Sequence, residues 1–331
     1  MKKKIQKNEK IFVAGARGMV GNAICKVLRK NGYGELGGGA ILTPSRAELN
    51  LLNTVSVKEW FDQNKPTIVI IAAAKVGGIL ANSTYPTEFL LENLKIQNNL
   101  IETSWQNKIK RLLFLGSSCI YPKFANQPIE EESLLTGELE ETNQPYAIAK
   151  IAGIKLCEAL RKQYNFDAIS LMPTNLYGKG DNYDNQSSHV MASFIKRFYE
   201  ASIQSLSSVT CWGSGTALRE FMHVDDLGDA VLHALEYWDP DSKDAPMDKF
   251  KNPIYLLNVG TGVDISIKKL ASKISKIVEY KGEILWDKSK PDGTPKKLLN
   301  INKIKSIGWE PKISLEAGII KTIKDYEVEY G

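Results

Sequence analysis

The sequence has 331 residues, of which 43% are hydrophobic and 24% are charged, with a formal net charge of +5. This composition is ordinary for a globular protein, and no stretch approaches the ~18 consecutive apolar residues of a membrane span. The positive charge forms no stripe interleaved with aromatic side chains. Nucleic acid is therefore not an expected partner, whereas a small anionic substrate is compatible with the charge.

Two features bear on the cellular compartment. The first ten residues, MKKKIQKNEK, carry part of the positive charge but lack the apolar segment of a signal peptide, so we expect a solvated leader. The four cysteines, Cys25, Cys119, Cys157 and Cys211, are widely spaced and form no CxxC pair. This spacing favours a reducing cytoplasm and argues against a disulfide framework or a structural zinc site.

Up to about residue 175, short apolar runs alternate with segments of helical spacing. Strands are predicted at 10–15, 40–43 (a weaker pattern), 67–74, 111–116 and 167–174. Helices are predicted between them at 18–32, 54–64, 86–106 and 146–164. Strands that alternate with crossover helices indicate an α/β fold with a doubly wound parallel sheet of the Rossmann type.

Beyond residue 175 the pattern changes to shorter elements, a Gly-, Asn- and Asp-rich loop at 178–187 and an acidic insert at 238–250. We therefore expect a dinucleotide-binding Rossmann domain at 1–175, to which later segments at roughly 220–260 return. Residues 176–331 are expected to form mainly a smaller C-terminal α/β lobe that binds the substrate.

A glycine-rich segment, VAGARGMVG, follows the first predicted strand and opens the first predicted helix. Its three glycines, Gly15, Gly18 and Gly21, permit a tight turn, close approach of the backbone to a pyrophosphate, and close packing of the helix on the strand. The strand before this motif and the amphipathic helix after it are the context that a dinucleotide site requires.

The residues after the second predicted strand bear on the choice of cofactor. A carboxylate commonly binds the ribose hydroxyls of NAD at that place, but here the strand is followed by Ser45 and Arg46, and Arg17 lies inside the glycine loop. Two guanidinium groups suit the 2′-phosphate of NADP(H), which arginine can bind through two hydrogen bonds. Glu48 is the alternative, as a carboxylate for NAD, and we favour NADP(H).

A tyrosine and a lysine stand one helical turn apart in QPYAIAKIAG, as Tyr146 and Lys150, with Pro145 at a tolerated first-turn position. An ammonium group at that distance is expected to stabilise the phenolate and lower the pKa of Tyr146, as acid–base catalysis requires. Ser117, at the end of the fourth predicted strand, can donate a hydrogen bond to the same carbonyl or alcohol oxygen.

The glycine motif at 15–21, Ser117 and the Tyr146-xxx-Lys150 pair together resemble the extended short-chain dehydrogenase/reductase family, whose members act on nucleotide sugars. The segments AAAKVGGI (72–79), LGSSCIYPK (115–123) and WGSGTALREF (212–221) extend this resemblance along nearly the whole chain. They narrow it to a branch that is both an epimerase and a reductase. The resemblance implies epimerisation of GDP-4-keto-6-deoxy-D-mannose at carbons 3 and 5, and reduction at carbon 4 by NADPH.

The resemblance also implies an acid/base pair for the epimerisation, Cys119 and His189. Inverting a carbon next to a keto group requires removal of a proton on one face and delivery on the other, and thiol and imidazole groups titrate in a suitable range. Tyr146 and Ser117 would stabilise the enolate. The sequence does not decide which of the pair abstracts the proton; we assign Cys119 as base and His189 as acid.

Further site residues follow from the resemblance alone. For the GDP-sugar they are Arg197, Trp212, Arg219, Asp292 and Lys297, of which the two arginines and Lys297 are the candidates for the diphosphate. For NADP(H) they are Gly15, Ala16, Arg17, Gly18, Met19, Val20, Gly21, Arg46, Leu51, Ala73, Leu115, Gly116, Ser117, Ser118, Lys150, Pro173, Thr174, Asn175, Leu176 and His189. Members of the family are commonly dimers, for which the helices at 84–105 and 146–164 are candidates.

Other functions stay open at this stage: another sugar-nucleotide 4-reductase, 4-epimerase or 4,6-dehydratase, or a regulator that senses NADP without catalysis. A dehydratase would need an acidic pair where Ser118 and Cys119 stand. The intact set of Ser117, Tyr146 and Lys150 argues against the regulator.

Overall fold

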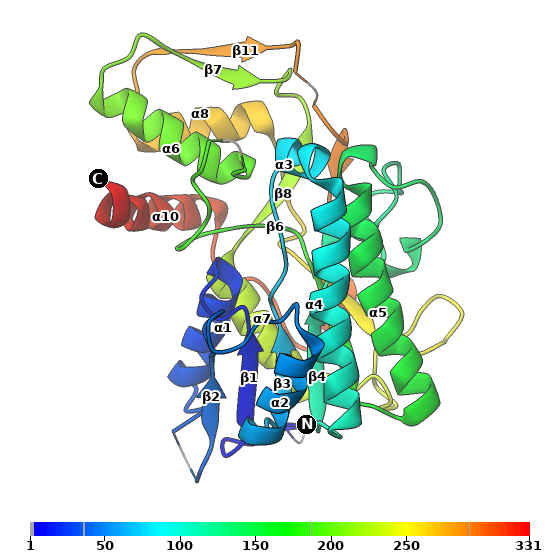
Figure 1. The fold of residues 1–331 in the computed structure, drawn as a ribbon. Helices are drawn as coiled ribbons and strands as arrows, with labels where there is room; N and C mark the ends of the chain where they lie inside the picture. Colours follow the sequence, from blue (N-terminus) through cyan, green and yellow to red (C-terminus); the bar gives the residue numbers. More distant parts are fainter. Residues whose placement is uncertain (1–2, 36, 186, 291) are drawn as a thin grey trace.

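The computed structural model describes residues 3–35, 37–185, 187–290 and 292–331. It consists of a layered α/β part and a smaller lobe packed against one end of it (Figure 1). Among the described residues, no helix combines the length and the apolar character needed to cross a membrane.

The central sheet has six parallel strands in the order β2-β1-β3-β4-β5-β9. They are β1 Lys10–Ala14, β2 Ala40–Leu42, β3 Ile68–Ile71, β4 Arg111–Leu115, β5 Ala168–Pro173 and β9 Leu256–Val259. The first five confirm the strands predicted from the apolar runs. Because the chain leaves β1 toward β2 and later returns to the other side of β1, the switch in strand order lies between β1 and β3, where such sheets bind ligands.

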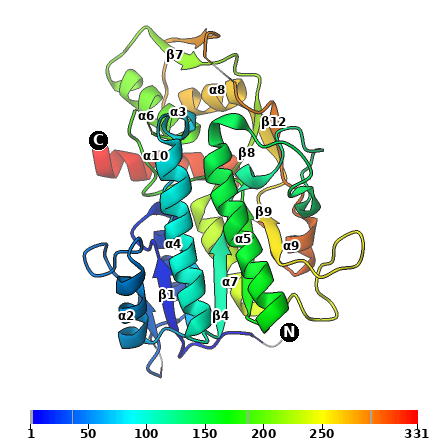
Figure 2. The ribbon, with the colours of Figure 1, turned by 45° about the vertical axis from the view of Figure 1, so that its right-hand side comes forward.

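Helices cover both faces of this sheet, as the doubly wound prediction requires (Figure 2). One face carries α2 Thr54–Asn64, α4 Pro86–Gln106 and α5 Gln144–Tyr164, with the short α3 Ile79–Thr84 at the upper end of α4. The other carries α1 Met19–Lys30 and α7 Val224–Tyr237, which lie against each other. The α1, α2, α4 and α5 helices confirm the predicted helices, each within two residues of its predicted bounds.

The N-terminal segment is not a solvated leader over its described residues, so that expectation was wrong. Ile5 is only 1% exposed and belongs to the main hydrophobic core. The ammonium groups of Lys3 and Lys4 pair with Glu236 and Asp239 at the end of α7, at 2.5 and 2.8 Å. The ion pairs of the two lysines therefore accompany burial of Ile5 in the main core. The positive charge of the segment had suggested that all of it was exposed.

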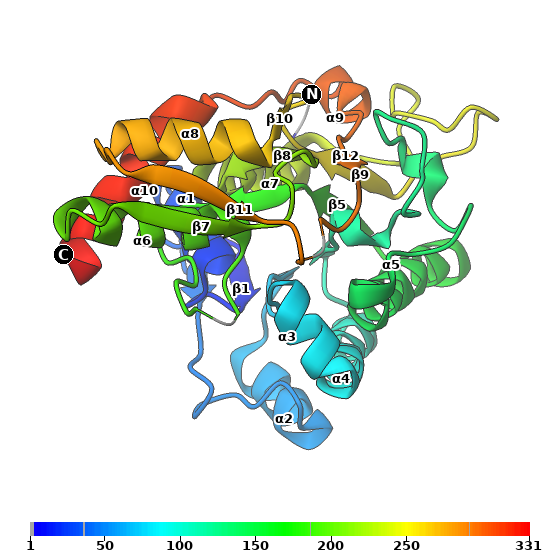
Figure 3. The ribbon, with the colours of Figure 1, turned by 90° about the horizontal axis from the view of Figure 1, so that it is seen from above.

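The smaller lobe has a second hydrophobic core. Its strands are β6 Asn175–Tyr177, β7 Ser208–Trp212, β8 Leu218–His223, β10 Asp264–Ser266, β11 Glu283–Asp287 and β12 Lys296–Lys297. Its helices are α6 Val190–Ile203, α8 Ile267–Ile277 and α10 Leu315–Tyr330, and α9 Asn302–Ser306 lies beside β9. Figure 3 shows the elements α6, α8, β7 and β11 of this lobe from above. Strand β8 is central, because β6, β10 and β12 all pair with it.

One buried carboxylate joins the two parts. Glu220 of β8 is 0% exposed and accepts hydrogen bonds from the backbone N–H groups of Thr261, Gly262 and Leu299, at 2.6, 2.7 and 3.0 Å. Burial raises the pKa of Glu220, and these hydrogen bonds oppose the rise. The side chain therefore ties β8 to the loop after β9 and to the segment after β12, at the junction where the site lies.

Candidate active site

The glycine loop connects β1 to α1 at the carboxyl edge of the sheet. Gly15 has a φ of +84°, and a Cβ at this residue would lie 2.7 Å from the backbone nitrogen of Ala73. A Cβ at Gly21 would lie 2.1 Å from the carbonyl oxygen of Gly15. Gly18 is the N-cap of α1, and its lack of a side chain leaves the first turn of the helix uncapped. This loop fits the pyrophosphate of a dinucleotide.

The segment after β2 favours a phosphorylated ribose over a plain one. The Glu48 carboxylate accepts a hydrogen bond from the backbone N–H of Ser45 at 2.6 Å. Hydrogen bonds from Ser45 and, more weakly, the charge of Arg17 lower the pKa of Glu48. Glu48 is thus engaged within its own turn, while Arg17 and Arg46 are exposed beside it.

Replacing Arg46 with alanine is expected to weaken the use of NADPH selectively. A hydrogen bond to a charged group contributes about 1.5–3 kcal/mol, so kcat/KM for NADPH should fall roughly 10–100-fold, with little change for NADH. Steady-state kinetics with both cofactors would measure this. Lys324→Ala, at an exposed position on α10, is the matched control. An equal loss with both cofactors would contradict the assignment of Arg46 to the 2′-phosphate.

The strand β4 ends in a 3₁₀ turn, Ser118–Ile120, that carries the predicted serine and cysteine. Ser117 is the N-cap of this turn, and its hydroxyl oxygen accepts a hydrogen bond from the backbone N–H of Cys119 at 3.2 Å. The hydroxyl of the next tyrosine, Tyr121, donates to Asn258 of β9 at 2.6 Å. The turn is therefore anchored to the sheet, with the Ser117 hydroxyl and the Cys119 thiol at the same edge as the glycine loop.

Lys150 of α5 is buried against the end of β4. The residue is 3% exposed, and its ammonium donates a hydrogen bond to the carbonyl oxygen of Leu115 at 2.8 Å. The same ammonium lies 4.8 Å from the ring centroid of Phe114. Burial lowers the pKa of Lys150 to about 7. A lysine held in this way can lose its charge near neutral pH.

The expectation that Lys150 lowers the pKa of Tyr146 was wrong for this structure. Burial raises the pKa of Tyr146, the charge of Cys119 adds to the rise, and a hydrogen bond with Ser117 opposes it. The Lys150 ammonium is directed to Leu115 and lies 5.9 Å from the centroid of the Tyr146 ring. Tyr146 therefore keeps its proton, which is the state that an acid needs if it is to protonate an alkoxide.

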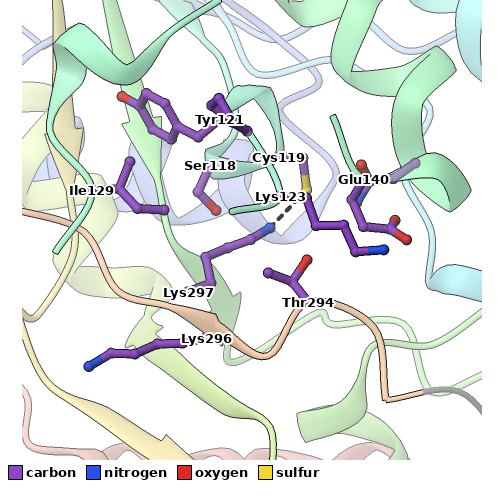
Figure 4. Close-up of a pocket in the computed structure, with 11 residues that line it drawn as sticks. Ser118, Cys119, Tyr121, Lys123, Ile129, Glu140, Thr294, Lys296 and Lys297 are labelled. Atoms are coloured by element: carbon purple, nitrogen blue, oxygen red, sulfur yellow. Dashed lines mark hydrogen bonds between the residues drawn. The ribbon is translucent and has the colours of Figure 1, made fainter. Parts of the chain in front are cut away.

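Both members of the acid/base pair predicted from the sequence interact with one lysine, Lys297. His189 is the N-cap of α6. Desolvation of its ring and the charge of Lys297 lower its pKa, although the residue as a whole is exposed. Lys297 donates to the sulfur of Cys119 at 3.6 Å (Figure 4). The neutral imidazole is thus favoured, and its protonated form would be a stronger acid than an unperturbed imidazolium.

The predicted GDP-sugar residues form an inner and an outer set. Arg219 of β8 donates to the carbonyl oxygen of Asp292 at 3.3 Å, and its pKa is lowered by burial and raised by the charge of Cys119, so it lies near the thiol. Arg197 donates to the carbonyl oxygen of Thr210 in β7, and Trp212, at the end of β7, is 56% exposed. The structure therefore brings Arg219, Asp292 and Lys297 together, whereas Trp212 ends β7 and Arg197 reaches β7 from α6.

The remaining predicted cofactor residues lie at the carboxyl ends of the sheet strands or in the turns that follow. Ala73 follows β3, Leu115 to Ser118 end β4, and Pro173 to Leu176 connect β5 to β6. Leu51 lies between β2 and α2. The side chains of Thr174 and Asn175 donate to the carbonyl oxygen of Glu220, at 3.3 and 2.7 Å, so their positions are fixed from the smaller lobe.

Sequence reasoning missed several residues around the thiol. One pocket is lined by Ser118, Cys119, Tyr121, Pro122, Lys123, Ile129, Glu140, Asn143, Thr294, Lys296 and Lys297. Asn143 is the N-cap of α5, and within the described residues its buried side-chain oxygen has no hydrogen-bond partner. In the sequence, Asn143 could have been noticed only because it stands three residues before Tyr146, a spacing that places it at the N-terminal end of the same helix.

The fold and the site define a dinucleotide-dependent enzyme of the Rossmann type with a Ser–Tyr–Lys set at the sheet's carboxyl edge. The chain belongs to the NAD dependent epimerase/dehydratase family, whose model matches residues 11–246. It is 49% identical over 314 residues to the GDP-L-fucose synthase of Escherichia coli, covering 95% of each chain. It is also 49% identical over 322 residues to the putative GDP-L-fucose synthase 2 of Arabidopsis thaliana, covering 97% of this chain and 93% of that one.

A solved structure adds a comparison in three dimensions. The GDP-mannoheptose C4 reductase MlghC of Campylobacter jejuni, with NADP bound, superposes with a TM-score of 0.85 at 34% identity. The match covers 98% of this chain and 99% of that one. The likeness therefore extends over both the sheet and the smaller lobe.

Proposed function

We propose that this protein converts GDP-4-keto-6-deoxy-D-mannose to GDP-L-fucose in two steps at one site, with NADPH as the reductant. The observation that carries the proposal is the presence of a thiol, Cys119, two residues after the serine of a reductase set. Ser117, Tyr146 and Lys150 suffice for reduction at carbon 4, whereas epimerisation at two further carbons needs additional acid/base groups. The relatives of nearly full length that are named GDP-L-fucose synthases support the same activity.

In the epimerisation, Cys119 is the base and His189 the acid. Cys119 removes the proton next to the keto group, and the Tyr146 and Ser117 hydroxyls donate hydrogen bonds to the enolate oxygen. His189 stands at the start of α6, on a different element from the thiol, as delivery to the opposite face of the ring requires. The same two groups serve carbons 3 and 5 in turn.

In the reduction, NADPH supplies the hydride to carbon 4 when it is bound. Tyr146 protonates the alkoxide as it forms, and its raised pKa keeps that proton in place until then. The Ser117 hydroxyl orients the oxygen on carbon 4. Lys150 of α5 supplies positive charge from its buried position beside the end of β4.

We assign the two ligands to the two parts of the chain. Residues 1–175, with 220–260, bind NADP(H) through the glycine loop, Arg17 and Arg46. Residues 176–331 mainly bind the GDP-sugar, with Arg219 and Arg197 at the diphosphate. Two separate hydrophobic cores support a division near residue 175, but the first core also includes Leu299, Ile301, Ile304, Ile307 and Trp309 from the C-terminal part.

The decisive experiment is to incubate the protein with GDP-4-keto-6-deoxy-D-mannose and either NADPH or NADH, and to identify the product by NMR. GDP-L-fucose formed with NADPH is the expected result. A product reduced at carbon 4 with carbons 3 and 5 unchanged would instead show a plain 4-reductase and overturn the epimerase assignment.

We further propose a homodimer in the cytoplasm. Apolar side chains exposed on α4 and α5, namely Leu91, Ile148 and Tyr164, support pairing through these two helices. The four free cysteines support a reducing compartment. Light scattering of the purified protein would measure the mass, and a monomer at micromolar concentration would contradict the first of these proposals.

A further inference from the structure

We propose that Lys297 is a positioning residue for epimerisation: its ammonium holds Cys119 as the thiolate that acts as base. This inference rests on the proposed function, in which Cys119 removes the proton, and it assigns Lys297 a role other than binding the diphosphate. The carrying observation is the Lys297 Nζ to Cys119 Sγ hydrogen bond of 3.6 Å between residues 178 positions apart in the chain.

The backbone that carries Lys297 is fixed on both sides. Strand β12 pairs in parallel with β8, where Lys297 stands opposite Arg219. The side chain of Gln127 donates to the carbonyl oxygen of Lys296 at 3.2 Å and accepts from the N–H of Leu298 at 2.8 Å. Each neighbour of Lys297 is therefore held by the same amide, and the lysine is presented from a rigid strand rather than from a free loop.

The side chains of Lys296 and Lys297 point to opposite faces of β12, because successive side chains alternate along a strand. Figure 4 shows the ammonium of Lys297 pointing to the thiol and that of Lys296 pointing away from it. Lys296 pairs with Asp264 of β10 at 3.3 Å. The chain thus contains a second lysine, one residue away and on the same strand, that serves as a matched control.

The thiol has other titratable neighbours, from β8, α5 and the loops around the pocket. They are Arg219, Tyr146, Lys123 and Glu140. His189, at the N-terminus of α6, interacts with Lys297. The Arg219 guanidinium donates to the backbone carbonyl oxygens of Leu218 and Asp292, at 2.9 and 3.3 Å. Lys297 is the cation with a hydrogen bond to the sulfur among the described residues.

An ammonium at this distance has consequences for both members of the acid/base pair. It favours the charged form of a thiol, and it disfavours the charged form of an imidazole, which is the direction that Lys297 imposes on His189. Lys297 therefore biases the pair toward thiolate and neutral imidazole. This polarity makes Cys119 the group that accepts a proton first, which the sequence alone left undecided.

The test is the pH dependence of thiol alkylation, measured without substrate or cofactor. Cys119 is partly exposed, whereas Cys25, Cys157 and Cys211 are buried, so iodoacetamide reports on Cys119, and Cys119→Ser gives the background. In Lys297→Met the pH of half-maximal alkylation should rise by about one unit or more. Lys297→Arg should restore most of the difference, and Lys296→Met should match the wild type.

A kinetic measurement separates this role from diphosphate binding. Lys297→Met should lower the rate of deuterium exchange into carbons 3 and 5 by roughly tenfold at pH 7. The single-turnover oxidation of GDP-L-fucose by NADP⁺ at saturating sugar, which needs no epimerisation, should fall much less than the exchange. An alkylation profile unchanged in Lys297→Met, or a rise of KM with exchange intact at saturation, would overturn the proposal. Because alkylation needs no substrate, failure of the proposed function would appear separately, in the product assay.

Discussion

The Cys119→Ser variant is expected to lose deuterium exchange at carbons 3 and 5 of the keto sugar while it retains hydride transfer. A serine hydroxyl is nearly the same size as a thiol but titrates far above neutral pH, so it cannot serve as the base. General acid–base groups contribute about 10²–10⁴-fold to rate, and the exchange should fall by that factor. The measurement is ¹H NMR of the substrate in D₂O without NADPH.

Retention of hydride transfer is the control for folding in this variant. Oxidation of GDP-L-fucose by NADP⁺ reverses only the last step, so its single-turnover rate in Cys119→Ser should stay within roughly threefold of wild type. Tyr146→Phe provides the contrast, because the phenol donates to the oxygen in both steps and both rates should fall. Exchange at the wild-type rate in Cys119→Ser would remove the thiol from the mechanism.

The features that the sequence predicted well are those that short stretches of chain encode. The glycines of the cofactor loop, the apolar runs of the five strands and the tyrosine–lysine spacing each act within about one turn or strand. Their predicted positions agree with β1, α1 and α5 because local backbone geometry decides them. The order of these elements along the chain then determines which edge of a parallel sheet they share.

The features that the sequence did not predict depend on contacts between distant residues. Lys297 was predicted only as a candidate for the diphosphate, and nothing near it in the sequence indicates that it contacts Cys119. Glu220 follows an arginine and was given no role from the sequence, yet it is completely buried and joins three segments. A charged side chain is usually exposed, so burial of this kind becomes visible only when the pairing of β8 and β12 is known.

The pKa of Tyr146 illustrates the same limit within a single helix. The spacing of Tyr146 and Lys150 correctly places them on one face of α5, but spacing does not give the direction of the ammonium. In the structure the Leu115 carbonyl takes that hydrogen bond, and desolvation outweighs the neighbouring charge. The structure therefore brings Tyr146 and Lys150 together as predicted. The predicted lowering of the Tyr146 pKa by the Lys150 ammonium is not found.

The Lys150→Met variant is expected to lose reduction and yet to unfold less readily than the wild type in the absence of ligands. Reduction should fall by about 10²-fold or more, because no cation is left beside the alkoxide. Burial lowers the pKa of Lys150 in the folded state to about 7, whereas the unfolded chain has the ordinary value of 10.5. The folded protein must therefore hold a charge that its surroundings disfavour, and methionine, of similar length, removes it.

The pH dependence gives this prediction its sign. Between pH 7 and 10.5 the unfolded state binds the Lys150 proton and the folded state does not, so the stability of the wild type should gain from rising pH in that window. The advantage of Lys150→Met should accordingly be largest at pH 6, on the order of 1–3 kcal/mol in the free energy of unfolding, and smaller at pH 9. Urea denaturation at the two pH values measures the difference.

Lys155→Met is the matched control, because Lys155 lies on the same helix with its side chain 46% exposed and paired with Glu158. It should change neither reduction nor the pH dependence of unfolding. If Lys150→Met were destabilised equally at pH 6 and pH 9, the buried ammonium would contribute favourably to the fold through its Leu115 hydrogen bond and the Phe114 ring. If the advantage at pH 6 is found, the protein keeps a residue that weakens its fold because the reaction at carbon 4 requires a charge at that place.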